Sequence, residues 1–161
     1  MRVKTARTDK YILLDDEDAG ILTKVNRSYS VSSHGYAVVV DFLGFIDGKY
    51  AYKKHYLHRL IMKAPKHLQV DHINGDRLDN RKENLRLCTN KSNNRNKPPI
   101  KGKYKGIFYD KKRSKWCSQI TKNRKVYTVG SNFTSPEEAA LAYNKFARRL
   151  HGKYAYQNIV E

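Results

Sequence analysis

Residues 70–96 read VDHINGDRLDNRKENLRLCTNKSNNRN, and this stretch decides the fold and the chemistry expected of the chain. In an extended backbone neighbouring side chains point to opposite faces, so Asp71 and His72 are expected to face opposite sides. One of them can then hold a metal ion while the other faces a water molecule. Neither residue is specific alone, because a lone histidine is more often structural and Asn74-Gly75-Asp76 is a common turn.

Hydrolysis of a phosphodiester bond needs an attacking water, a base to deprotonate it, and a cation to neutralise the leaving 3′ oxygen. A single carboxylate rarely holds a hard divalent ion, so a second oxygen ligand must come from elsewhere. The polar segment 90–96 offers carboxamide oxygens on an expected helix, with Lys91 and Arg95 near enough to contact phosphate. A calcium loop is the alternative, but the segment lacks the acidic register and terminal glutamate of an EF-hand.

The stretch resembles the HNH endonuclease family, most of all its phage and intron-associated homing subgroup. The resemblance covers roughly residues 55–97 with the family's own spacing. It rests on Leu57–Met62, Val70–Asp76, Leu78–Arg81, Glu83–Arg86 and Asn93–Asn96.

This resemblance implies a ββα-metal unit, in which two strands and a helix surround one divalent ion. By position, Asp71 and Asn93 are the implied metal ligands and His72 is the implied general base. Asn84 is implied to pin the loop between the strands and so to orient His72. An amide ligand favours Mg²⁺ or Mn²⁺ over zinc. His58 is interpreted as structural, in a helix that packs under the site.

An α+β fold is expected, with a β-rich N-terminal region. A short strand at 11–14 precedes the acidic run Asp15–Asp18, and Asp47-Gly48 predicts a hairpin between residues 42–46 and 49–56. Residues 57–62 are predicted to be helical and to stop before Pro65. The domains expected are a nuclease domain at 1–97, a basic linker at 98–103 and a further domain at 104–161.

Three short strands and one helix are predicted for this C-terminal domain, at residues 105–109, 115–121 and 125–130. Ser135, Pro136 and Glu138 form a capping box that predicts the start of the helix, and Gly152 predicts its end. The strands are expected to turn one face to the helix, with Ile107, Trp116, Ile120, Tyr127 and Val129, and to leave the other face uncovered.

The C-terminal segment resembles the DNA-binding domain of plant ethylene-response factors and of some phage integrases. The matching pieces include Tyr104–Ile107, Lys115-Trp116, Val129-Gly130 and Glu137–Ala140. In that family the open sheet face enters the major groove, so base or phosphate contacts are implied at the corresponding positions. The full set of candidate DNA-binding residues is Arg86, Lys91, Arg95, Lys105, Lys111, Arg113, Gln119, Thr121, Lys122, Arg124 and Thr128.

The charge supports a polyanionic partner. The chain has 33 Lys and Arg against 15 Asp and Glu, a net charge of +18. Both halves are basic, with 19 basic and 11 acidic side chains in residues 1–97 and 12 basic and 4 acidic in residues 104–161. Double-stranded DNA is therefore the expected partner. A solubilising surface or a ribosome-associated protein would give the same charge.

Two cysteines without a C-x-x-C pair argue against a disulfide framework and against structural zinc. No segment resembles a signal peptide or a membrane span, so the expected location is intracellular, in the cytoplasm of a bacterial or phage-infected cell. No dimer signal is visible, so a monomer or weak dimer is expected. Two other functions stay open: a non-catalytic DNA-binding regulator derived from a nuclease, and an RNA-binding protein, for which no module is recognisable.

Overall fold

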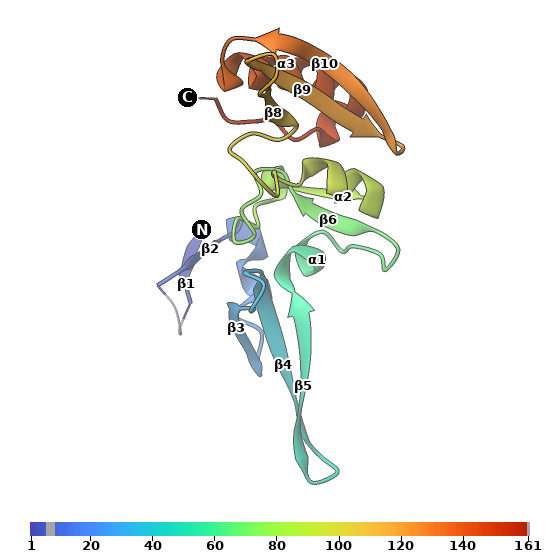
Figure 1. Ribbon diagram of the computed structural model, residues 1–161. Coiled ribbons are helices and arrows are strands. Elements are labelled where there is room, and N and C mark those ends of the chain that lie inside the picture. Colours follow the sequence, from blue (N-terminus) through green and yellow to red (C-terminus); the bar gives the residue numbers. More distant parts are fainter. Residues whose placement is uncertain (6–8, 161) are drawn as a thin grey trace. The chain divides into compact units, whose positions relative to one another are not determined.

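The computed structural model describes residues 1–5 and 9–160, and the chain forms two compact units, Met1–Asn90 and Lys91–Glu161 (Figure 1). The division precedes nearly all of helix α2 (Asn90–Asn96), so α2 and the expected linker 98–103 both belong to the second unit. Glu161, the last residue of the expected C-terminal domain, lies outside the described residues. Among the described residues, no helix is long and apolar enough to cross a membrane.

The first unit is built around a three-stranded antiparallel sheet in the order β3 (Arg27–Val31), β4 (Ala37–Ile46) and β5 (Lys49–Tyr56). Asp47 and Gly48 both have positive φ, 49° and 75°, at the turn between β4 and β5. Such a turn matches the right-handed twist of the two strands it joins. The predicted hairpin is therefore confirmed.

The other elements of this unit surround the segment expected to carry the chemistry. Strand β6 (Gln69–His72) pairs antiparallel with β7 (Leu85–Cys88). Short elements complete the unit: β1 (Arg2–Lys4), β2 (Tyr11–Leu13), η1 (Asp16–Ile21), α1 (Leu57–Ile61) and η2 (Lys82–Asn84). A single apolar core joins them through Ile12, Leu14, Leu22, Ala37, Val39, Leu57, Ile61, Val70 and Leu85. The core thus fixes the β6–β7 pair against β4 and α1.

Arg59 fixes the connection that leads from α1 into β6. Its guanidinium donates to the carbonyl oxygens of Leu68 at 2.8 Å, Ala64 at 3.1 Å and Pro65 at 2.9 Å. The planar fork of an arginine suits several fixed acceptors at once. The irregular segment after α1 is therefore held at both ends, which sets where β6 begins.

The β4–β5 hairpin extends past β3 as a two-stranded ribbon (Figure 1). Its tip carries ring pairs at centroid distances of 5.4 Å for Phe42–Tyr52 and 5.1 Å for Phe45–Tyr50. Phe45 and Tyr50 are 64% and 69% exposed. These rings contact each other in pairs, and all of them except Phe42 leave most of their surface in solvent.

The second unit packs one helix against a three-stranded antiparallel sheet. The strands lie in the order β10 (Lys125–Phe133), β9 (Lys115–Lys122) and β8 (Ile107–Asp110), and they are followed by α3 (Pro136–His151) and η3 (Gly152–Tyr154). Together with the first unit this gives the predicted α+β fold. Sheet and helix meet in a core of Ile107, Ile120, Tyr127, Val129, Tyr143, Phe146, Ala147, Leu150 and Ala155. Trp116 was expected in this set but is not part of the core, and its ring centroid lies 5.1 Å from that of Tyr109.

Helix α3 begins and ends at the predicted residues. Ser135 Oγ accepts a hydrogen bond from the Glu138 amide at 3.1 Å, which satisfies one of the free N–H groups of the first turn. The Glu138 carboxylate accepts from the amide and hydroxyl of Thr134, both at 3.0 Å. Gly152, with φ of 60°, follows the last turn. The capping residues thus define the element that covers the sheet.

Gly106 provides a test of how closely the sheet and α3 pack. It has φ of +77°, and a Cβ there would lie 2.3 Å from the Gln119 carbonyl oxygen and 2.5 Å from Tyr143 Cε2. We expect Gly106→Ala to lower the free energy of unfolding by about 1–3 kcal/mol or more through overpacking and backbone strain. Urea denaturation of the full chain measures the change.

The matched control is Gly102→Ala, because Gly102 also has φ of +77° but has no atom within 4 Å of the added Cβ. Only the conformational cost, about 1 kcal/mol, applies there. Equal losses in the two variants would show that the close approach at Gly106 contributes nothing.

Candidate active site

Asp71 and His72 lie side by side in β6 and face opposite sides of the β6–β7 pair. The register pairs Asp71 with Arg86 and His72 with Leu85. Residues directly opposite in an antiparallel pair project from the same face. Asp71 and Arg86 therefore share one face, while His72 occupies the other.

Asp71 is held in a buried ion pair. Its Oδ2 accepts hydrogen bonds from Arg86 Nε at 2.8 Å and from Arg86 Nη2 at 2.5 Å. The two side chains are only 7% and 10% exposed. The carboxylate thus already stabilises a positive charge at its oxygen atoms, in surroundings where an unpaired charge would be costly.

His72 lies in a cluster of rings on the opposite face. Its ring centroid is 5.0 Å from that of His58 and 6.0 Å from that of Tyr36. Burial lowers the pKa of His72 below the ordinary histidine value, and the Asn80 side chain and the Asp71 charge oppose this only in part. The imidazole is therefore uncharged at neutral pH, which is the form able to accept a proton.

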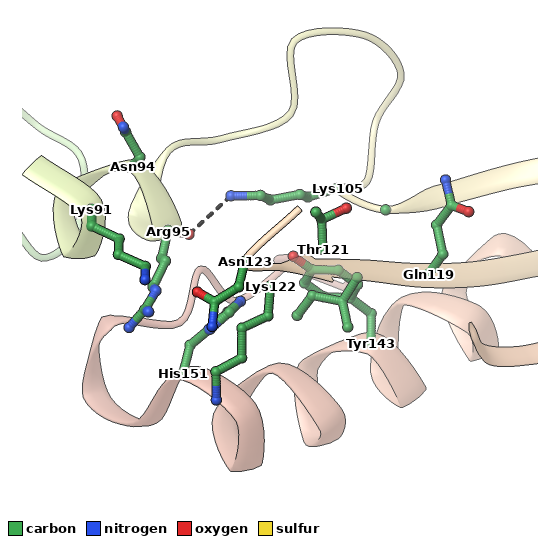
Figure 2. A pocket seen from close by; sticks show the side chains of 12 residues that line it. Lys91, Asn94, Arg95, Lys105, Gln119, Thr121, Lys122, Asn123, Tyr143 and His151 are labelled. Atoms are coloured by element: carbon green, nitrogen blue, oxygen red, sulfur yellow. Dashed lines mark hydrogen bonds between the residues drawn. The ribbon is translucent and has the colours of Figure 1, made fainter. Parts of the chain in front are cut away.

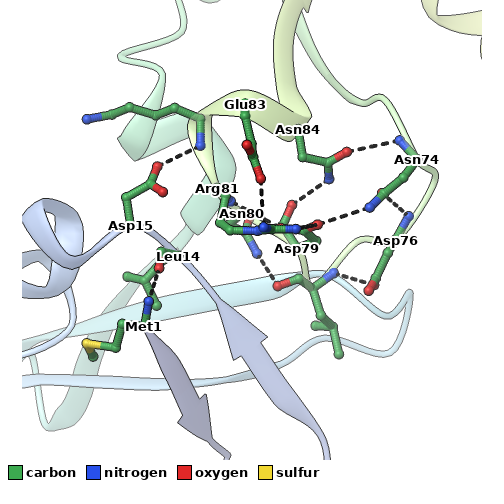
Figure 3. A network of polar contacts seen from close by, with 12 residues as sticks. Met1, Leu14, Asp15, Asn74, Asp76, Asp79, Asn80, Arg81, Glu83 and Asn84 are labelled. Carbon is green, nitrogen blue, oxygen red and sulfur yellow. Dashed lines mark hydrogen bonds and ion pairs between the residues drawn. The ribbon is translucent and has the colours of Figure 1, made fainter.

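Asn84 joins the two ends of the loop that follows His72 (Figure 3). Its Oδ1 accepts from the Asn74 amide at 3.0 Å, and its Nδ2 donates to the Asp79 carbonyl oxygen at 2.8 Å. Its own carbonyl oxygen accepts from the Ile73 amide at 2.8 Å. These bonds fix the backbone directly after His72 relative to the start of β7.

Asp79 and Asp76 serve the same loop and do not converge on a common point. The Asp79 carboxylate accepts from Asn74 Nδ2 at 3.0 Å and from Arg81 at 2.8 and 2.9 Å. Asp76 Oδ1 accepts from the Leu78 amide at 2.9 Å. Of the acidic residues that suggested a calcium loop, Asp76 and Asp79 thus close a turn, and Asp71 pairs with Arg86.

Comparison with known proteins finds an HNH endonuclease segment in the chain. A family model described as HNH endonuclease matches residues 55–95, which include β6, β7 and the loop between them that Asn84 holds. An uncharacterized HNH endonuclease of Acanthamoeba polyphaga mimivirus is 32% identical over 111 residues, which are 65% of this chain and 58% of that protein. Protein 3.8 of Escherichia phage T7 is 32% identical over 96 residues, which are 56% of this chain and 76% of that protein.

The chain belongs to the family of phage T7 protein 3.8, and it contains an HNH endonuclease domain. The chain spans just over half the length of the mimivirus relative, 58%. No solved structure matches the chain. Asp71, His72 and Asn84 all fall inside the matched HNH segment.

The remaining candidate ligand of the HNH domain, Asn93, lies in α2. Since the second unit begins at Lys91, Asn93 belongs to it, and its role as a metal ligand stays a prediction. Arg86 was expected to contact DNA, whereas in the structure its guanidinium forms an ion pair with Asp71.

The candidate DNA-binding residues of the second unit fall into three groups, two of which share Gln119 and Thr121. Gln119, Thr121 and Thr128 lie on the uncovered sheet face with exposed side chains, and the register pairs Thr128 with Gln119. Lys111, Arg113 and Arg124 lie in the turns between strands, where Arg113 pairs with Asp110 at 2.8 Å. A third group is gathered in one pocket: Lys91, Arg95, Lys105, Gln119, Thr121 and Lys122.

Three residues near His72 were not singled out as site residues from the sequence: Tyr36, Asn80 and Arg77. Arg77 lies 4.7 Å from the centroid of the Tyr36 ring, and its Nη1 donates to the His34 carbonyl oxygen at 2.6 Å. Asn80 is fully buried beside His72. The string Leu78–Arg81, which contains Asn80, was the available signal, but only the folded chain brings Asn80 to the histidine.

His58 gives the HNH domain a defined acid sensitivity. Burial, assisted by the charges of His72 and Arg59, lowers the pKa of His58 to about 3. The unfolded chain therefore binds one more proton than the folded chain below the ordinary histidine pKa of 6.5. Stability is complete above that pH and decreases by about 1.4 kcal/mol per pH unit as the pH falls toward 3.

We expect urea denaturation of the full chain between pH 7.5 and 4.5 to show this dependence of stability on pH. His58→Gln should reduce the slope by about 1.4 kcal/mol per pH unit, the contribution of one proton. His72, whose pKa is also lowered, contributes in the same direction and keeps part of the slope in the variant. An unchanged slope in His58→Gln would contradict the assignment.

Proposed function

We propose that the chain is a metal-dependent endonuclease that hydrolyses phosphodiester bonds in duplex DNA, and that its second unit binds the duplex. One observation carries the proposal. A neutral, buried histidine follows directly after a carboxylate in β6, and its loop is fixed by Asn84, all within the segment that matches the HNH model.

The donor set fits a hard divalent ion. Asp71 offers carboxylate oxygen and Asn93 offers amide oxygen, the donor types that Mg²⁺ and Mn²⁺ prefer. Asp71 also stabilises a positive charge already, that of Arg86. Asp71 and Asn93 are therefore the residues that would hold the ion. When bound, the ion would neutralise the charge that develops on the leaving 3′ oxygen.

The protein's own residues divide the remaining work. His72 takes the proton from the attacking water, because its lowered pKa keeps the ring neutral. Asn84 acts as a positioning residue, since it fixes the loop that follows His72 and does not need to touch the substrate. One active site per chain cuts one strand at a time, so a monomer is expected to favour nicking.

The second unit is proposed to dock on the duplex through its uncovered sheet face. Gln119, Thr121 and Thr128 offer hydrogen-bonding groups there, and exposed Phe108 and Val126 add apolar surface. A sheet face of this kind can contact base edges in the major groove. The excess of Lys and Arg supplies the phosphate attraction.

The ion pair between Asp71 and Arg86 also favours a second function, a DNA-binding regulator derived from a nuclease. In that protein Arg86 would permanently take the place of the metal ion at Asp71. Cleavage of duplex DNA that requires Mg²⁺ would exclude this function.

The proposal is tested with end-labelled duplex and single-stranded oligonucleotides of the same sequences, incubated with the full chain in Mg²⁺, Mn²⁺ or Zn²⁺. We expect cleavage of the duplex in Mg²⁺ or Mn²⁺, with products that end in 3′-hydroxyl and 5′-phosphate. Products with 3′-phosphate would rule out the proposed direction of attack. A strong preference for the single strand would overturn duplex DNA as the substrate.

A further inference from the structure

A basic pocket lies within the second unit, with a cavity volume of about 420 Å³ (Figure 2). Its cationic lining comes from Lys91 and Arg95 on α2, Lys105 before β8, and Lys122 at the end of β9. No acidic side chain lines it. Segments far apart in the sequence therefore bring four positive charges to one cavity.

These four cations are not neutralised by carboxylates in the part of the chain that the structure describes. None of them takes part in an ion pair there, whereas Arg113 pairs with Asp110 and Arg81 with Asp79. Like charges gathered in a partly buried space repel one another, and an anion at the centre relieves that repulsion. The pocket thus has the electrostatics of an anion site.

Two of the lysines are fixed in position by neutral acceptors. Lys105 Nζ donates to the carbonyl oxygens of Arg95 at 2.9 Å and Lys97 at 2.6 Å, at the end of α2. Lys122 Nζ donates to the Leu150 carbonyl oxygen at 3.2 Å. Carbonyl oxygens orient an ammonium group without cancelling its charge. The charges of Lys105 and Lys122 are therefore already in place before any ligand arrives.

The protonation equilibria agree with an uncompensated cluster. Burial and the charge of Lys97 lower the pKa of Lys105 to about 8. Burial lowers the pKa of His151 as well, and Arg95 and Lys122 add to that effect. His151 Nδ1 is buried without a hydrogen-bond partner among the described residues. An anion would stabilise the protonated form of both groups.

We propose that this pocket binds a phosphate group of the nucleic-acid backbone. Arginine and lysine together match the several acceptor oxygens of a phosphate, and Gln119, Thr121 and Asn94 add neutral donors around them. That the phosphate belongs to DNA rests on the proposed function. That the pocket binds an anion does not depend on it.

The site also connects phosphate binding to α2. This helix has seven residues and none of them is buried, so little packing stabilises it. Two of its residues, Lys91 and Arg95, line the pocket, and Asn93 lies between them in the sequence. Phosphate in the pocket is therefore expected to stabilise the helix that carries the proposed second metal ligand.

The test uses the full chain in excess chelator, so that no strand is cut, and follows backbone amide signals by NMR. Inorganic phosphate, compared with chloride at equal ionic strength, should shift the amides of Gly106 and residues 119–123 and slow hydrogen exchange in α2. Arg95→Gln and Lys122→Gln should each weaken phosphate binding about tenfold or more, since charge-assisted hydrogen bonds are lost. Lys145→Gln, an exposed α3 lysine outside the pocket, is the matched control.

Duplex DNA and a poly-glutamate peptide distinguish the sources of the anion. For duplex DNA the slope of log affinity against log salt should fall by about one in Arg95→Gln relative to Lys145→Gln. Phosphate shifts elsewhere in the chain, or pocket variants that behave like Lys145→Gln, would overturn the site. Tighter binding of poly-glutamate than of DNA would assign the pocket to an acidic protein instead.

Metal-dependent cleavage is measured separately, so the two proposals can fail independently. A chain that binds phosphate in the pocket but never cuts DNA retains the site and loses the nuclease. If the chain cuts DNA while phosphate binds elsewhere, the nuclease proposal stands and the phosphate site is wrong.

Discussion

His72→Ala is expected to lower the rate of strand cleavage by about 10²–10⁴-fold, the usual contribution of a general base. The ring is uncharged at neutral pH and lies on the face of β6 opposite Asp71, so its removal takes away the proton acceptor but not the metal ligand. DNA affinity should stay within about twofold, since the expected phosphate contacts lie elsewhere. Single-turnover cleavage and a binding titration in chelator measure the two quantities.

The matched control for this variant is His67→Ala. His67 is an exposed histidine just before β6, so the chemical change is the same while the ring cluster stays intact. It should cleave at the wild-type rate. Equal cleavage by wild type and His72→Ala would show that another group deprotonates the water.

Asp71→Ala is expected to lower the free energy of unfolding by about 3–5 kcal/mol, because it removes the carboxylate that balances the charge of the buried Arg86 guanidinium. The double variant Asp71→Ala/Arg86→Leu should recover most of this loss, since both charges are then absent. Urea denaturation of the full chain in chelator measures stability apart from any metal.

The exposed ion pair between Lys4 and Asp9 supplies the comparison, with side chains 59% and 97% exposed. Asp9→Ala should cost about 0–1 kcal/mol, as exposed pairs do. A loss in Asp71→Ala no larger than that in Asp9→Ala would mean that the Asp71 pair is not effectively buried.

The parts of the fold that follow from local chemistry could be predicted from the sequence. The hairpin at Asp47-Gly48 depends on two residues that tolerate positive φ, and α3 depends on the cap at Ser135. In both cases the residues that decide the conformation are neighbours in the chain. Asp47-Gly48 predicted the two strands of the hairpin, but it could not show that rings at the tip would stay exposed.

The candidate site was predictable in its residues and not in its contacts. The resemblance to the HNH family singled out Asp71, His72 and Asn84, whereas the Asp71–Arg86 ion pair depends on the register between β6 and β7. Lys105 was expected to contact DNA, but the sequence did not show that its ammonium would donate hydrogen bonds to the carbonyl oxygens of Arg95 and Lys97 at the end of α2. Such contacts arise between segments that meet only after folding.

The most direct measurement is incubation of the full chain with supercoiled plasmid, in Mg²⁺ and in excess chelator. The proposed nuclease predicts nicked or linear plasmid in Mg²⁺ and intact plasmid in chelator. Tight binding of duplex DNA without a single strand break in Mg²⁺ would contradict it. The protein would then be a DNA-binding protein in which Arg86 pairs with Asp71 in place of a metal ion.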